Sequence, residues 1–144
     1  MDLTERIFEL AQCGYFCGQI LAKLLLETIG EDNTGLVKAM GGLNGGAGFS
    51  SGLCGCMTGG CCLISYFTGK GGDTSFDDPQ HKAALGDFTS WFKEEMTLNF
   101  GGTDCADITK GDPSNQVTIC PQVIADTYVK CMEILSERGF LSDL

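Results

Sequence analysis

The sequence has a single histidine, His81, among 144 residues. A histidine-rich metal site or a cysteine–histidine hydrolase would have to be built on this one side chain. It lies near the start of a predicted helix, which favours a solvent-facing residue. Cysteine pairs with the Cys-x-x-Cys spacing are also missing, which excludes the thioredoxin motif, zinc knuckles and the bacterial ferredoxin run. Without Cys-x-x-Cys-His there is no c-type haem attachment motif.

Positive charge is scarce, because nine lysines and arginines stand against 19 aspartates and glutamates. The net charge of −10 argues against binding to nucleic acid or to anionic membrane surfaces, and it suits a basic redox partner protein. The first residues, MDLTERIFEL, lack the basic segment of a signal peptide, and no apolar run is long enough to span a bilayer. We therefore expect a cytoplasmic protein without membrane contact.

Alternating apolar and polar runs of four or more residues are few, so a sheet is not expected. Helical periodicity and capping signals instead predict helices over about 3–13, 15–29, 35–40, 53–67, 79–100 and 121–138. One further helical turn is expected around Cys105, within the loop that follows Phe100. Asp78 is the expected cap, and Pro79 the expected first residue, of the fifth of these. The sequence predicts one all-α domain over residues 1–144. It would be a compact bundle of four or five helices with a glycine-rich loop leading into a short central helix.

The stretch GGLNGGAGFSSGLCGC, residues 41–56, joins the glycine loop to the predicted central helix. Its first half is too rich in glycine for a regular element. Cys54 and Cys56 follow in the first helical turn, where free backbone N–H groups and the helix dipole favour an anion. This position should lower the pKa of a cysteine and make its thiolate a better nucleophile or metal ligand.

Four cysteines fall at or near predicted helix starts: Cys17, Cys54, Cys105 and Cys120, the last of which is a candidate N-cap. Four helix starts that converge would suit a tetrathiolate metal or iron–sulfur centre, and equally a redox thiol pair. In the cytoplasm, cysteines are more often ligands or redox thiols than structural disulfides. The plainer alternative is packing, since free cysteine is a small and frequently buried hydrophobe.

These features resemble the redox-active family named C_GCAxxG_C_C for its cysteine pattern. Its members have about this length, an early Gly-Tyr-x-Cys entry, a glycine-rich stretch leading into Cys-Gly-Ala-x-x-Gly, and two later cysteines. The matching segments are Gly14-Tyr15-Phe16-Cys17, Gly45-Gly46-Ala47-Gly48, Cys54-Gly55-Cys56-Met57-Thr58-Gly59, Phe100-Gly101-Gly102-Thr103-Asp104-Cys105 and Ile119-Cys120. The sequence departs from the family at Cys56, where alanine is usual, and at Cys61 and Cys62, where small residues are expected.

The resemblance implies a redox role. A related domain lies at the N-terminal side of split-Soret cytochromes, which carry an iron–sulfur centre. By this analogy Cys17, Cys54, Cys105 and Cys120 would ligate an iron–sulfur cluster, most simply [2Fe–2S]. The cluster would serve electron transfer or redox sensing.

Two other functions stay open. One is thiol–disulfide chemistry, with Cys54 as the attacking thiolate and Cys56 or Cys120 as its resolver. The other is a zinc-stapled binding module, against which the missing Cys-x-x-Cys pairs weigh.

The remaining cysteines have alternatives of their own. Cys56, Cys61 and Cys62 would either extend the site as ligands or redox thiols, or replace small residues where helices approach closely. Cys131 belongs to an apolar stripe that favours packing, and Cys13 is undecided. Because a glycine loop beside a cluster would need shielding, we also expect a homodimer.

Overall fold

The computed structural model describes residues 2–144, and over that range it contains helices and no strand. A single isolated antiparallel bridge joins Leu53 and Asp104. The predicted all-α class is confirmed, and five of the helices have ten or more residues. The elements are α1 (Leu3–Gln12), α2 (Cys17–Ile29), α3 (Thr34–Met40), the 3-10 helix η1 (Gly41–Leu43), α4 (Gly55–Thr68), α5 (His81–Phe100), α6 (Cys105–Thr109), α7 (Asn115–Thr118) and α8 (Cys120–Glu137).

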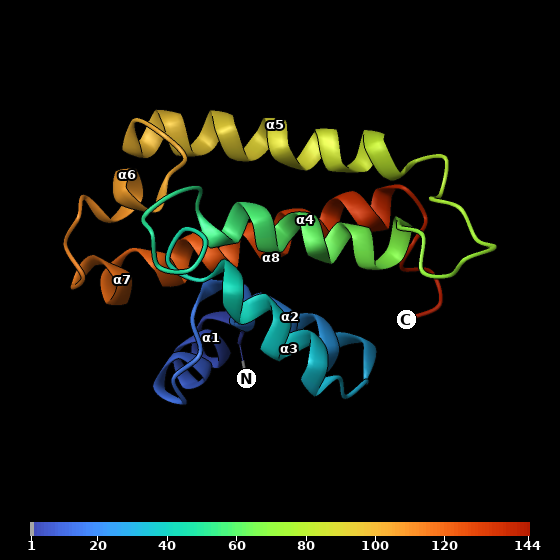
Figure 1. Cartoon of the computed structure of the whole chain (residues 1–144), viewed down its shortest axis with the longest axis horizontal. Coiled ribbons are helices and arrows are strands. Elements are labelled where there is room, and N and C mark those ends of the chain that lie inside the picture. Colours follow the sequence, from blue (N-terminus) through green and yellow to red (C-terminus); the bar gives the residue numbers. More distant parts are fainter. Residues whose placement is uncertain (1) are drawn as a thin grey trace.

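Helix α4 is the centre of the bundle, as Figure 1 shows. Helix α5 packs along one side of it, α2 along the other, and α8 lies behind it in that view. The short helices α6 and α7 and the glycine loop gather at one end, around the start of α4. The expected central helix after a glycine-rich loop is therefore present.

Small and apolar residues explain the central position of α4, because a helix that is apolar on most of its faces must be covered on most of them. Leu63 and Ile64 of α4 are fully buried, and Phe88 and Phe92 of α5 pack against the same core. The predicted stripe on α8 is confirmed, since its four members are all buried: Ile124, Tyr128, Cys131 and Leu135.

Two details around the start of α5 were predicted wrongly. The helix begins at His81, because Pro79 and Gln80 form a turn in which the Asp78 carboxylate accepts the Gln80 N–H at 2.8 Å. His81 is half-buried rather than solvent-facing, with Nδ1 2.8 Å from Thr68 Oγ1. The Thr68 hydroxyl donates to the Ile64 carbonyl at 3.0 Å, so it accepts the Nδ1 proton of His81.

The start of α8 differs by one residue from the prediction. Cys120 is the first helical residue rather than the N-cap, which is Ile119, and Pro121 follows as the second. Proline fits there because the first backbone N–H groups of a helix have no intrahelical partner. Between residues 2 and 144, no helix is long and apolar enough to cross a membrane.

The contact between α4 and α5 depends on a glycine. A Cβ atom on Gly60 would lie 2.2 Å from the ring of the buried Phe88. We expect Gly60→Ala to lower the free energy of unfolding by about 1–3 kcal/mol, because overpacking a close helix contact forces the ring to shift. Urea unfolding measures this effect.

Gly86 on α5 provides the matched control, since a Cβ there meets no atom within 4 Å. Gly86→Ala should leave stability unchanged or raise it by up to about 1 kcal/mol through helix propensity. Equal effects of the two substitutions would contradict this packing.

Candidate thiol site

Five cysteines line one cavity of about 190 Å³ between the starts of α2, α4, α6 and α8: Cys17, Cys54, Cys56, Cys105 and Cys120. The structure thus brings together the four cysteines that the sequence groups as one site. Cys17, Cys105 and Cys120 are the first residues of α2, α6 and α8, and Cys54 is the N-cap of α4. Cys56, the second residue of α4, joins them.

Two backbone hydrogen bonds hold the starts of α4 and α6 side by side. The N–H of Cys54 donates to the carbonyl of Thr103 at 3.0 Å, and the N–H of Cys105 donates to the carbonyl of Gly52 at 2.7 Å. This small bridge is the only strand-like pairing in residues 2–144. It fixes the positions of two thiols that are 51 residues apart in sequence.

The starts of α2 and α4 are in direct contact because glycines occupy the crossing. A Cβ on Gly55 would lie 2.5 Å from Cys17 Sγ, and a Cβ on Gly59 would lie 3.0 Å from Leu21 Cδ1. Neither position has room for a larger residue. Cys17 can therefore reach the first turn of α4.

Asn44, from the glycine loop, caps α2. Phe16, the local N-cap residue, provides no side-chain cap, but Asn44 Oδ1 accepts the N–H of Gly18 at 3.1 Å. Asn44 Nδ2 donates in turn to Gln19 Oε1 at 3.1 Å, and the asparagine is buried. The loop thereby satisfies a backbone donor next to Cys17 and is itself held against the start of α2.

The loop after Asn44 is strained. Ala47, Phe49 and Ser51 have φ between 60° and 65°, a region that costs non-glycine residues roughly 1–2 kcal/mol each. The exposed Phe49 ring packs edge-on against Phe16, with ring centroids 5.3 Å apart. Backbone strain of this kind is concentrated at functional sites, and here it lies beside the thiols.

Cys17, Cys54 and Cys56 line the cavity together, and hydrogen bonding by the Cys56 side chain is the largest cause of the pKa shifts of the other two. This hydrogen bonding lowers the pKa of Cys17 to about 7 against the opposing effect of burial, and the backbone amides of Gly45 and Gly18 contribute. The same thiol lowers the pKa of Cys54, with help from the Cys56 N–H, which lies 3.4 Å from Cys54 Sγ. The pKa of Cys56 is raised by its bonds to the two sulfurs and by complete burial.

The predicted effect of the helix start on cysteine pKa therefore holds for Cys54 and is wrong for Cys56. Burial also raises the pKa of Cys105 and raises that of Cys120 to about 12, and the nearby Cys54 and Cys17 sulfurs add to both shifts. The cavity walls around these thiols are largely apolar, with Ile7, Ile20, Ile108 and Ile124 among them. Apolar walls limit the solvation of a thiolate, so negative charge on these sulfurs needs a partner.

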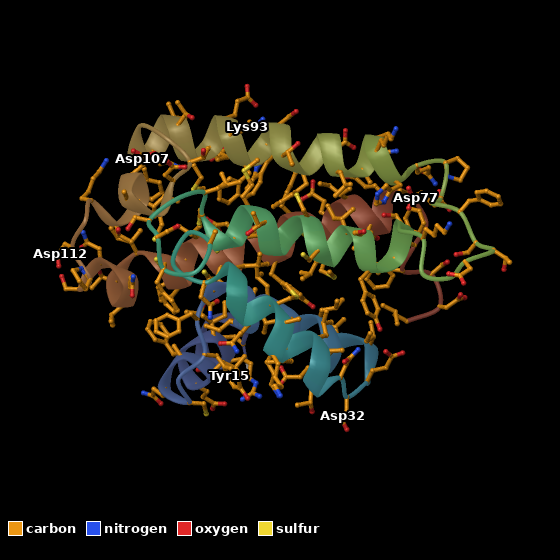
Figure 2. All side chains as sticks on the ribbon, in the orientation of Figure 1. Tyr15, Asp32, Asp77, Lys93, Asp107 and Asp112 are labelled. Atoms are coloured by element: carbon orange, nitrogen blue, oxygen red, sulfur yellow. The ribbon has the colours of Figure 1, made fainter. Side chains whose placement is uncertain are left out.

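The other four cysteines do not line the cavity within the part of the chain described. Cys131 is fully buried and donates to the Gly60 carbonyl at 3.6 Å, which agrees with its predicted packing role. Cys61 is half-buried, and Cys62 and Cys13 are exposed. His81 also lies apart: it is 4.0 Å from Asp77, which Figure 2 shows at the opposite end of the molecule from Asp107 of α6.

Over residues 2–144, no three cysteine, histidine, aspartate or glutamate side chains are arranged to hold a single metal ion. Instead, Cys17 and Cys54 form one group with Cys56, and Cys105 and Cys120 lie elsewhere on the cavity wall. Cys56 also lines the cavity, close to Cys54, which is an N-cap with non-helical backbone angles.

Fold and site together define a class: a helical, cysteine-rich protein with its thiols collected at converging helix starts. Comparison with protein families matches residues 15–134 to the family described as "Putative redox-active protein (C_GCAxxG_C_C)". The chain belongs to this family. No curated protein and no solved structure matches it in the corresponding comparisons.

The contact between Cys17 and Cys56 predicts a pH dependence. In metal-free, reduced protein, iodoacetamide should label Cys17 with a midpoint near pH 7, below the value of about 8.5 for a free thiol. The lowered pKa means that the reactive thiolate forms as pH rises through 7. Peptide mass spectrometry after labelling at a series of pH values measures this midpoint.

Cys56→Ala removes the largest cause and should move the Cys17 midpoint to higher pH. Cys62→Ala, outside the cavity, should leave it unchanged. A wild-type midpoint at or above the value of a free thiol would contradict the hydrogen bond.

Proposed function

We propose that this protein binds an iron–sulfur cluster, most simply [2Fe–2S], through Cys17, Cys54, Cys105 and Cys120, and serves in electron transfer or redox sensing. The observation that carries the proposal is the presence of these four thiols around one cavity. Four thiolates are the usual ligand set of such a cluster, and each iron of a [2Fe–2S] centre needs only two of them. A cluster therefore does not require three thiols around one ion.

The residues fit such a group chemically. Thiolates in an apolar cavity need positive charge, and cluster irons would supply it together with one-electron redox chemistry. The backbone N–H of Gly45 toward Cys17 and that of Cys56 toward Cys54 would stabilise negative charge on sulfur. Hydrogen bonds to ligating sulfurs are one of the means by which proteins set a reduction potential.

Anaerobic purification or reconstitution, followed by absorption spectroscopy and iron and sulfide analysis, tests the proposal. The wild-type protein should absorb between about 400 and 500 nm, as thiolate-bound iron–sulfur centres do, with iron and acid-labile sulfide in equal amounts. Cys105→Ser and Cys120→Ser should each lose most of the iron and sulfide, because each removes a cavity thiol with no hydrogen-bonded neighbouring thiol to replace it.

Cys62→Ser provides the control, since this exposed thiol lies outside the cavity and should keep the wild-type cluster content. Equal iron and sulfide in the Cys120→Ser and wild-type proteins would refute the ligand assignment. Zinc without iron would favour the binding module.

Thiol–disulfide chemistry is a second candidate, because the Cys56 thiol contacts Cys54 and Cys54 has a lowered pKa. The Cys54 thiolate would attack a substrate disulfide, forming a mixed disulfide and releasing one substrate thiolate. Cys56 would then attack Cys54, which releases the second thiolate and leaves a Cys54–Cys56 disulfide. This function predicts a colourless protein that loses two free thiols per chain under mild oxidation.

The homodimer and the redox partner protein stay predictions. The exposed Phe16 and Phe49 rings lie next to the thiol cavity, where a second copy would shield them. Elution at the 15.3 kDa monomer mass at micromolar concentration would exclude the homodimer. The net charge of −10 favours a partner with a basic surface.

A further inference from the structure

The thiol cavity contains one more cysteine than a four-thiolate cluster uses. Cys56 is 1% exposed and lines the same cavity as Cys17 and Cys54, two of the four proposed ligands. The chain thus buries a fifth thiol in the wall of the cavity that the four proposed ligands line.

The backbone fixes Cys56 in this position. It is the second residue of α4, and its N–H lies 3.4 Å from Cys54 Sγ. Gly55, between the two cysteines, has no space for a side chain because Cys17 Sγ would lie 2.5 Å from its Cβ. The sulfurs of Cys17, Cys54 and Cys56 are thus confined together by the first turn of α4 and the start of α2.

The extra thiol, Cys56, lies on one part of the cavity wall. The pKa of Cys105 is raised by burial and by the charge of the Cys54 and Cys17 sulfurs. The pKa of Cys120 is raised by burial and by the charge of Cys54, Cys17 and Cys105. Neither has a hydrogen bond to Cys56. A thiol that replaces a missing ligand must already lie near that ligand, and Cys56 satisfies this condition for Cys17 and Cys54 only.

We propose that Cys56 is a substitute ligand: it can take the place of Cys54, or of Cys17, in holding the cluster, and it is dispensable while both are present. The inference rests on the proposed function. Its physical basis is that a cysteine thiol is a ligand for iron once it loses its proton, and that this thiol lies in the first turn of α4, in the same cavity as the two thiols it would replace. The site then has three overlapping sets of four thiols, all of which include Cys105 and Cys120.

The test compares iron and sulfide content and absorption spectra of anaerobically reconstituted variants. Cys56→Ala should retain the wild-type spectrum and content. Cys54→Ser should retain iron and sulfide with shifted absorption maxima, because a different sulfur completes the set. Cys54→Ser combined with Cys56→Ala should lose the cluster. Cys17→Ser and the double variant Cys17→Ser with Cys56→Ala form a second, independent pair. The single variant should retain iron and sulfide, and the double variant should lose them.

Cys120→Ser is the internal control, since it should lose the cluster whether or not Cys56 is present. Thermal unfolding of each metal-free variant checks that the loss of iron and sulfide is not caused by unfolding of the protein. If a Cys54 variant does not fold, the two Cys17 variants decide the test. Loss of iron and sulfide in both single variants, Cys54→Ser and Cys17→Ser, would overturn the inference, because Cys56 is intact in each. Loss of the cluster in Cys56→Ala would also overturn it.

Failure of this inference is distinguishable from failure of the proposed function. A wild-type protein that takes up no iron and sulfide contradicts both. A wild-type protein with a cluster that disappears in both Cys54→Ser and Cys17→Ser contradicts the substitute ligand alone and leaves the four-cysteine site in place.

Discussion

The close approach of the starts of α2 and α4 is the contact on which the site depends. Gly59 of α4 would place a Cβ 3.5 Å from the Cα of Gly18, so the two helices meet nearly backbone to backbone. One turn earlier, Gly55 leaves room for Cys17 Sγ. A larger residue at this crossing would separate the helices and move Cys17 away from Cys54 and Cys56. The strained loop and the capping by Asn44 are arranged around the same crossing.

Competing electrostatic effects decide the state of each thiol. A helix start favours a thiolate, whereas burial among isoleucines opposes it. At Cys17 and Cys54, the hydrogen bond with Cys56 together with backbone amides outweighs burial, and the pKa of each is lowered. At Cys105 and Cys120 burial prevails, and the negative charge of the other sulfurs adds to it. In a metal-free cavity a thiolate therefore forms more readily at Cys17 and Cys54 than at Cys105 and Cys120.

Much of this arrangement could be predicted from local patterns. The helix starts at Cys17 and Cys105, the central helix after the glycine loop and the buried stripe on α8 all follow from periodicity and capping residues. Contacts across the chain could not be predicted in this way. The half-buried His81 depends on Thr68, 13 residues away, and the bridge between Leu53 and Asp104 joins two loops.

Cys56 shows the limit most clearly. Its position beside Cys17 could not be predicted, because Cys54 precedes the helix with non-helical backbone angles and α2 brings Cys17 to the same cavity. The composition of the first turn predicted a lowered pKa for any cysteine there. The pKa is lowered at Cys17 and Cys54 and raised at Cys56, and only the tertiary structure shows this difference.

The most direct test of the account is a crystal structure of the anaerobically reconstituted protein with anomalous diffraction measured at the iron edge. The account predicts iron peaks inside the cavity between the starts of α2, α4, α6 and α8, bonded to cysteine sulfurs that include Cys105 and Cys120. Iron located outside this cavity, or a cavity whose cysteines are free or joined in disulfides while the protein carries iron elsewhere, would contradict it.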